Sequence, residues 1–194
     1  YFVKKVYDHY ISMSHVHVGK GTVINGKSTL VGSKDSKIFI GKYCAIADGL
    51  QIFTLNHDPN FPAIQGKFYK SFFNSGHPGE LTNPPTLERT KGNVTIGNNV
   101  WIGANVYISS GITIGDGAII GAKSVITKDV EPYSLHCGNP GVFKKYIFDQ
   151  DKRKFLLELK WWDWSDEKIK KNRGFFFTNL KTSTIQRIQE NIIN

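Results

Sequence analysis

The chain has 194 residues, of which 40% are hydrophobic and 21% charged, and its formal net charge is +9 at pH 7. This length suits one domain with appendages and a substantial core. No apolar run approaches the roughly 18 residues of a membrane-spanning helix, and two cysteines are too few for a disulfide framework. With no recognisable secretory signal, the composition favours a cytoplasmic protein, although the sequence does not begin with methionine.

The positive charge indicates either an anionic ligand or simply a basic surface. The lysines and arginines are scattered along the chain, and no fold motif of nucleic-acid-binding proteins accompanies them. We therefore expect no nucleic-acid partner. A phosphorylated co-substrate accounts for the charge as well as nucleic acid would.

The first regular pattern is an aliphatic residue at every sixth position. The stretch before it, residues 1–14, is ambiguous. Two sets of three hexads follow, at Val18, Ile24 and Leu30 and then at Ile40, Ile46 and Ile52. The step from the first set to the second is not a multiple of six, which predicts a small bulge near Ser33–Lys37.

Residues 54–93, called the excursion below, contain no hexads. They hold five prolines, two histidines and several aromatic residues. A loop of this length inside a domain is usually functional or disordered, and aromatic side chains oppose disorder because they need a surface to pack on. We therefore interpret the excursion as an ordered loop that leaves one corner of the domain and covers a site.

The hexads are most regular after the excursion, with isoleucine at Ile96, Ile102, Ile108, Ile114, Ile120 and Ile126. A period of six fits neither the α-helix nor the alternation of a strand, and the glycines and β-branched residues oppose a helix. A fixed hexad with one large aliphatic residue predicts a mainly β fold, a parallel β-helix. Three hexads then make one coil of about 18 residues, and the aliphatic side chains stack inside.

Beyond Pro132 the hexads stop, and Gly138–Gly141 predicts a turn. The sequence thus divides into a β-helix domain over residues 1–146 and a helical extension over residues 147–194. The tryptophans of residues 161–164 are expected to pack the extension against the β-helix. Three helices are expected in it, one from the N-cap Asp149 to about Lys160, one over Glu167–Asn172 after the N-cap Ser165, and one over Thr184–Ile193.

Several motifs occur in one order along the chain. They are the hexads, Asn56-His57-Asp58 in the excursion, Val125-Ile126-Thr127-Lys128-Asp129, Gly138-Asn139-Pro140 and Lys160-Trp161-Trp162-Asp163-Trp164. In this order, residues 40–172 resemble the xenobiotic acetyltransferase subgroup of the hexapeptide-repeat acyltransferases, which includes streptogramin and type-B chloramphenicol acetyltransferases and relatives that acetylate bacterial surface sugars. The resemblance implies a left-handed β-helix, a homotrimer, acetyl-CoA as donor, and active sites between neighbouring subunits.

Acetyl transfer to an alcohol needs a group that removes the hydroxyl proton and a group that stabilises the tetrahedral oxyanion. Histidine suits the first task because its ordinary pKa lies near neutrality. His57 is the best candidate, since it follows the Ile52 hexad at the expected edge of the three-sided β-helix, called the prism below, and matches the family's general base. The alternative is a loop histidine that holds a turn with Asp58 and Pro59. No residue has to form an acyl-enzyme, so we expect direct transfer.

Other residues are expected to contact the acceptor, a small molecule or a glycan. Asn56 and Asp58 are placed to orient the His57 ring or the acceptor, and Trp101 is expected to point outward onto the donor or the acceptor. His77 lies deeper in the excursion. It is expected either to contact the acceptor or a neighbouring subunit, or to lie at the surface of the loop.

The donor needs a long groove with accessible backbone. Four small residues would let the pantetheine arm approach, although they suit hexad turns equally well: Gly103, Ala104, Gly121 and Ala122. The resemblance places Thr127 and Lys128 by the pantetheine and pyrophosphate and lets Asn139 and Pro140 shape the groove. Either Lys144 or Lys145 is expected at the 3′-phosphate as a point charge, unless both are solvated.

A zinc enzyme on the same fold would need three zinc-binding histidines, and no close pair of them lies at the prism edge, so we expect no metal. A non-enzymatic β-helix scaffold is the alternative of another class. Within the enzyme class, the charged residues of the excursion favour a hydroxyl-rich acceptor. The sequence predicts O-acetylation of a sugar hydroxyl in a bacterial surface polysaccharide or its precursor. An antibiotic of the streptogramin or chloramphenicol type is the alternative acceptor, and N-acetylation of an amino sugar stays open.

Overall fold

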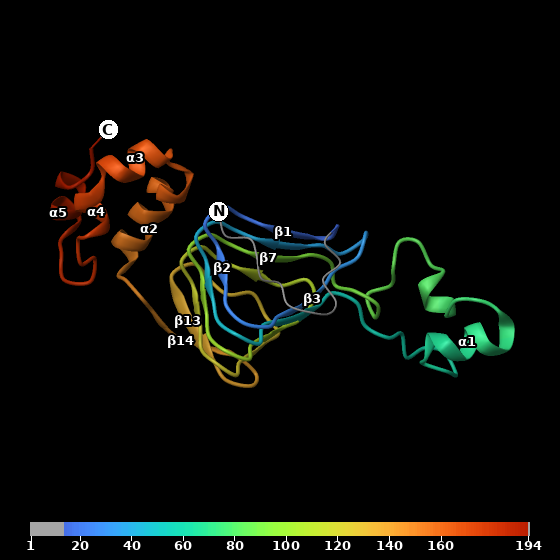
Figure 1. Ribbon diagram of the computed structural model, residues 1–194. Helices are drawn as coiled ribbons and strands as arrows, with labels where there is room; N and C mark the ends of the chain where they lie inside the picture. Colours follow the sequence, from blue (N-terminus) through green and yellow to red (C-terminus); the bar gives the residue numbers. More distant parts are fainter. Residues whose placement is uncertain (1–13, 194) are drawn as a thin grey trace.

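The structure is a computed structural model that describes residues 14–193. Short parallel strands wind into a left-handed β-helix, a triangular prism with three sheets as its faces (Figure 1). Sheet A contains β1 (Val16–Val18), β4 (Ile38–Ile40), β7 (Val94–Ile96) and β10 (Thr113–Ile114). Sheet B contains β2 (Val23–Ile24), β5 (Ala45–Ile46), β8 (Trp101–Ile102), β11 (Ile119–Ile120), β13 (Ser134–Cys137) and β14 (Val142–Tyr146). Sheet C contains β3 (Thr29–Val31), β6 (Gln51–Phe53), β9 (Tyr107–Ile108) and β12 (Val125–Ile126).

The hexad residues from Leu30 onward form the core, which confirms the fold expected from the six-residue period. Each of the six hexad isoleucines of the regular part, from Ile96 to Ile126, is at most 1% exposed. Strand register stacks these side chains directly, as in sheet C, where Ile108 pairs with Ile52 on one side and Ile126 on the other. Because successive coils stack aliphatic side chains in each column, a continuous apolar core runs along the prism.

The corners between the sheets are tight, and neighbouring coils approach each other closely there. A Cβ atom on Gly103 would lie 2.5 Å from the backbone nitrogen of Ala122, and one on Gly121 would lie 2.6 Å from Cβ of Cys137. The neighbouring coil therefore leaves no room for a side chain at either glycine. The bulge expected near Ser33–Lys37 is present as a turn, closed by hydrogen bonds between Ser33 and Ser36.

The last coil ends in a feature that the sequence did not indicate. After the turn, β14 returns antiparallel to β13, so Val142–Tyr146 form a strand at the edge of sheet B. All five of its residues are exposed, and they lack the hexad pattern because the strand lies beyond the last complete coil. The Asn139–Pro140 peptide bond in the turn is cis.

The extension is helical and lies beside the prism, at one end of the elongated molecule (Figure 1). Its elements are α2 (Gln150–Leu159), η2 (Trp161–Asp163), α3 (Asp166–Lys171), α4 (Arg173–Phe176) and α5 (Ile185–Glu190). The side chains of the expected N-caps Asp149 and Ser165 accept hydrogen bonds from backbone N–H groups in the first turn. The third helix is shorter than expected, since it ends at Glu190.

A second hydrophobic core holds the extension together and joins it to the prism. Tyr133, from the last coil, is buried in this core with Leu156, Phe175 and Ile188. As expected from the tryptophan cluster, Trp162 is 2% exposed and Trp161 packs on Tyr43 of the prism, with ring centroids 5.2 Å apart. Two ion pairs, Lys42–Asp163 and Lys20–Asp166, bridge the same junction at the surface.

The excursion projects from the opposite end of the molecule (Figure 1). It leaves the corner between sheets C and A after β6 and returns at β7. It contains α1 (Gly66–Phe73) and the short helix η1 (Pro78–Glu80), so it is ordered, as its aromatic content indicated. Among residues 14–193, no helix is both long and apolar enough to cross a membrane.

Candidate active site

The two ends of the excursion meet in a neck, formed by residues 56–60 and 86–90. Where the neck meets the prism, two hydrogen bonds join Asn56 and Arg89. The backbone N–H of Asn56 donates to the carbonyl of Arg89 at 2.7 Å, and Nη1 of Arg89 donates to the carbonyl of Asn56 at 2.8 Å. The neck is therefore closed beside the prism, immediately after β6.

His57 lies between two anchored residues of this neck. Asn56, which precedes it, is hydrogen-bonded to Arg89. Asp58, which follows it, is 1% exposed and makes its hydrogen bonds within the excursion. The His57 side chain itself is exposed. The candidate base thus stands on a fixed backbone at the edge of the rigid prism, with its ring accessible to a ligand.

Asp58 has a different position from the one expected of an acceptor contact. One carboxylate oxygen accepts from the backbone N–H of Asn60 at 3.0 Å, and the other accepts from the Thr86 hydroxyl at 3.2 Å. A Cβ on Gly79 would lie 2.7 Å from this carboxylate, so η1 also packs closely on it. Both oxygens are engaged within the excursion, and Asp58 joins its two ends instead of facing an acceptor.

The expectation for His77 is corrected in the same way. His77 is 1% exposed, so it does not lie at the surface of the excursion. Its Nδ1 accepts from the backbone N–H of Gly79 at 3.0 Å, and its Nε2 lies 3.0 Å from the carbonyl of Ala63, to which it donates when Nδ1 is the acceptor. The rings of Phe61 and Tyr69 pack edge-on against the imidazole. His77 is the internal support of the excursion.

The residues expected at the donor lie on two corners of the prism. Three pairs share the corner between sheets B and C: Gly103 with Ala104, Gly121 with Ala122, and Asn139 with Pro140. Thr127 and Lys128 follow β12 at the corner between sheets C and A, from which the excursion also leaves. One strand, β9, separates β12 from β6, so Lys128 starts roughly 10 Å along the prism from the excursion. Both Thr127 and Lys128 are exposed.

The outer face of sheet B joins two further expected residues. Trp101 pairs in register with Ile119, Ile119 with Leu135, and Leu135 with Lys145. These side chains form one outward-facing row, since register partners point to the same side of a sheet. Trp101 is 56% exposed, and the row combines apolar surface with a cation at its end. Lys144 is also exposed and lies next to the point where the β13–β14 register shifts.

Within a single chain, the candidate base and most of the donor residues stay apart. His57 leaves the corner between sheets C and A, whereas Gly103, Gly121 and Asn139 line the corner on the other side of sheet C. Residues 14–193 contain no group of three or more histidine, cysteine, aspartate or glutamate side chains arranged to hold a metal ion.

Arg89 holds the neck together, and the sequence alone does not indicate it. Its side chain is 12% exposed and also pairs with Glu80 at 3.6 Å. Its partner Asn56 lies 33 positions away. No local pattern signals a contact over that distance.

Comparison with known proteins gives consistent results. The family model for the bacterial transferase hexapeptide (six repeats) matches residues 93–128. A probable macrolide acetyltransferase from Lysinibacillus sphaericus is 42% identical over 160 residues, covering 81% of this chain and 83% of that protein. A chloramphenicol acetyltransferase from Klebsiella aerogenes is 37% identical over 134 residues, covering 69% of this chain and 63% of that protein. The solved structure of a galactoside acetyltransferase in complex with coenzyme A has a TM-score of 0.52 and 32% identity, covering 72% of this chain and 58% of that one.

The fold and these similarities define the class of protein, which is a hexapeptide-repeat acyltransferase. The chain belongs to the hexapeptide-repeat acetyltransferase family, in the group that includes xenobiotic-type members. It spans less than two thirds of the chloramphenicol and galactoside enzymes compared here.

Proposed function

We propose that the protein transfers an acetyl group from acetyl-CoA to a hydroxyl of its acceptor, with His57 as general base. The observation that carries the proposal is the exposed His57 side chain on an anchored neck at the prism edge. The solved galactoside acetyltransferase that the chain resembles contains coenzyme A, and the row from Trp101 to Lys145 offers apolar surface and a cation to such a donor.

In the proposed reaction, the acceptor hydroxyl attacks the thioester carbonyl while His57 takes its proton. The tetrahedral intermediate then collapses, the C–S bond breaks, and the proton on His57 neutralises the departing CoA thiolate. No residue of the chain is acylated. The base lowers the barrier because the attacking oxygen loses its proton as its bond to carbon forms.

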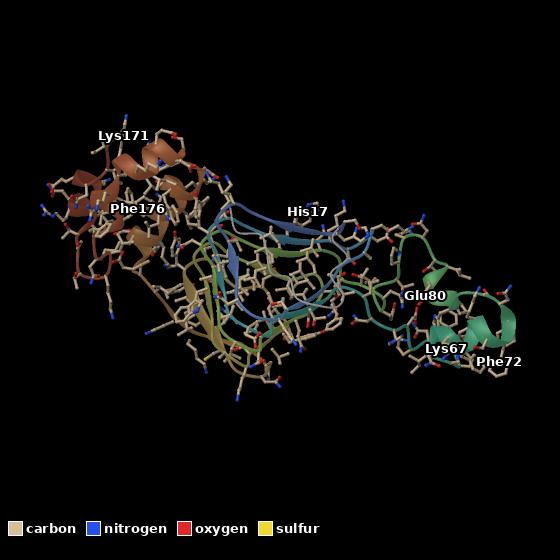
Figure 2. The ribbon with its side chains drawn as sticks, viewed as in Figure 1. His17, Lys67, Phe72, Glu80, Lys171 and Phe176 are labelled. Atoms are coloured by element: carbon tan, nitrogen blue, oxygen red, sulfur yellow. The ribbon has the colours of Figure 1, made fainter. Side chains whose placement is uncertain are left out.

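We propose that the acceptor is a hydroxylated antibiotic rather than a sugar polymer. Two findings favour this reversal of the sequence-based preference. First, the polar residues of the excursion are partly engaged internally, since Arg89 pairs with Glu80 and Asp58 is buried. Second, aromatic side chains are among those most exposed on it: Phe72 and Phe73 of α1 are 72% and 63% exposed. Figure 2 shows Phe72 at the far end of the excursion. An amphipathic acceptor suits that surface, and a macrolide is the substrate class named for the 42% identical relative.

A sugar hydroxyl is the second candidate. It is supported by the similarity to a galactoside acetyltransferase at 32% identity. The two acceptor classes are distinguished by following the release of CoA thiol from acetyl-CoA with macrolides, streptogramins, chloramphenicol, simple galactosides and polysaccharide fragments. Steady turnover with a glycan, and none with an antibiotic, would reverse the order proposed here.

The role of His57 is tested with His57→Ala. We expect kcat to fall by about 10²–10⁴-fold, the usual contribution of a general base, while acetyl-CoA still binds. His17 on sheet A is the matched control, because it is an exposed prism histidine that stacks on Phe39 and lies outside the excursion (Figure 2). His17→Ala should keep the parental rate. A loss of less than about threefold in His57→Ala would remove His57 from the proposed role.

We further propose that the active site is completed by a second copy of the chain, in a homotrimer. The support is the separation, within one chain, of His57 from the corner that carries Gly103 and Asn139. Mixing unfolded His57→Ala and Lys145→Ala subunits, refolding them together and assaying at acetyl-CoA concentrations well below the KM, where loss of Lys145 slows turnover, tests this. Activity above that of either variant alone is expected if base and donor site come from different subunits. A monomer in solution would contradict it.

A further inference from the structure

The contact between Arg89 and Asn56 acts on the peptide group that leads into His57. The carbonyl that accepts from Nη1 of Arg89 belongs to Asn56, and it shares one planar peptide unit with the backbone nitrogen of His57. A donor that fixes this oxygen therefore fixes the plane from which Cα of His57 projects. We propose that Arg89 is a positioning residue that sets the direction of the His57 side chain. This inference rests on the proposed role of His57.

Both sides of His57 are held by the same short turn. Asn56 is bonded to the backbone and the guanidinium of Arg89, and Asp58 accepts from the hydroxyl of Thr86 at 3.2 Å. Thr86 and Arg89 are themselves joined, because the N–H of Arg89 donates to the carbonyl of Thr86 at 3.0 Å. The turn over residues 86–89 is thus hydrogen-bonded to the residues immediately before and after the candidate base.

The charge of the guanidinium strengthens this contact. The Arg89 side chain is 12% exposed, its bond to the carbonyl of Asn56 lies at the surface, and a charged donor makes a stronger hydrogen bond than a neutral one. Its second partner, Glu80, lies 3.6 Å away at the end of η1. Figure 2 places Glu80 between the prism and the tip of the excursion. Arg89 consequently connects the neck beneath His57 with the body of the excursion.

Arg89 could instead merely stabilise the excursion, and kinetics separate the two roles. A misdirected base impairs the chemical step, and a displacement of about 1 Å is enough for a roughly 10²-fold loss. It leaves acetyl-CoA binding unchanged. The loss must also depend on the presence of His57, because Arg89 acts only through that side chain. A stabilising role predicts neither result.

The test uses Arg89→Met, which keeps an unbranched apolar stem and removes the donors and the charge. We expect kcat to fall by about 10–100-fold, with the KM for acetyl-CoA changed by less than about twofold. Lys91→Met is the control. It removes the same charge two positions away from an exposed side chain with no hydrogen bond or ion pair within residues 14–193, and should retain the parental kcat. Arg89→Lys, which keeps one charged donor, should lie between Arg89→Met and the parent.

The decisive measurement is a double-mutant cycle. Adding Arg89→Met to His57→Ala should cause no further loss, so the two effects should be strongly non-additive. A full additional loss in the His57→Ala background, or a parental kcat in Arg89→Met, would overturn the inference. If Arg89→Met does not fold, as judged by circular dichroism, the same cycle with Arg89→Lys decides.

The two proposals fail differently. If His57→Ala retains the parental rate, the proposed base is wrong and the role of Arg89 falls with it. If His57→Ala is impaired while Arg89→Met and Arg89→Lys are not, only the role of Arg89 is overturned.

Discussion

Ile120 on β11 and His136 on β13 are register partners in sheet B, so the histidine occupies the interior position at which the ladder would place its next isoleucine. His136 is 9% exposed, its Nε2 has no hydrogen-bond partner among the described residues, and Phe143 of β14 packs edge-on against its ring. An ionisable residue therefore closes the end of an otherwise apolar column.

This position makes the stability of the last coil depend on pH. Burial lowers the pKa of His136, and this effect outweighs the opposing one of Glu131. The unfolded chain, in which histidine has its ordinary pKa of about 6.5, then binds the proton more tightly than the folded one. The free energy of unfolding must fall as the pH drops through and below that value.

We expect His136→Leu to remove part of this dependence. Urea unfolding at pH 7.5 and about pH 5 should show a smaller decrease in unfolding free energy for His136→Leu than for the parent chain. His17→Gln replaces an exposed histidine and should keep the parental pH dependence. Parallel pH curves for His136→Leu and the parent would show that His136 does not titrate differently in the two states.

The donor site predicts a difference between two adjacent lysines. Lys145 continues the outward row that begins at Trp101, whereas Lys144 lies where the register shifts. If the row binds the donor, Lys145→Ala should raise the Kd for CoA by several-fold and leave that for dephospho-CoA almost unchanged, since a lysine meets a phosphate as a point charge. Lys144→Ala serves as the matched comparison in the same calorimetric titrations. Equal weakening of both ligands by Lys145→Ala would place this lysine away from the 3′-phosphate.

The stability of the extension should depend on its hydrophobic core and much less on its surface ion pairs. Leu156 is 2% exposed, and Leu156→Ala should lower the free energy of unfolding by about 2–5 kcal/mol because it leaves a cavity. Asp163→Asn breaks the exposed pair with Lys42 and should cost less than about 1 kcal/mol. Thermal unfolding of both variants shows which substitution lowers the stability more. A larger effect of Asp163→Asn would mean that the junction relies on charge.

The sequence predicts most where a pattern repeats. The six hexad isoleucines from Ile96 to Ile126 could be assigned to the core because each coil imposes the same requirement on the next. The strand Val142–Tyr146 could not be found in this way, because it lies outside the ladder, runs antiparallel, and buries none of its side chains.

The candidate site shows the same division. His57 was identified because it directly follows the hexad of Ile52, at a position that the ladder defines. The burial of His77 and the bond between Arg89 and Asn56 depend on how the excursion folds back on itself. Contacts between residues far apart in an aperiodic segment leave no signal in composition or spacing.

The strands on either side of the excursion have one more consequence. Ile52 pairs with Ile108 as though residues 54–93 were absent, so the stacking of coils does not record how long the inserted segment is or what it contains. The excursion is an insertion at one corner of the prism, between sheets C and A, and it can be exchanged without changing how the coils stack. If the excursion contacts the acceptor, as proposed, a change of acceptor can arise by replacing this segment alone, while the stacked coils stay as they were.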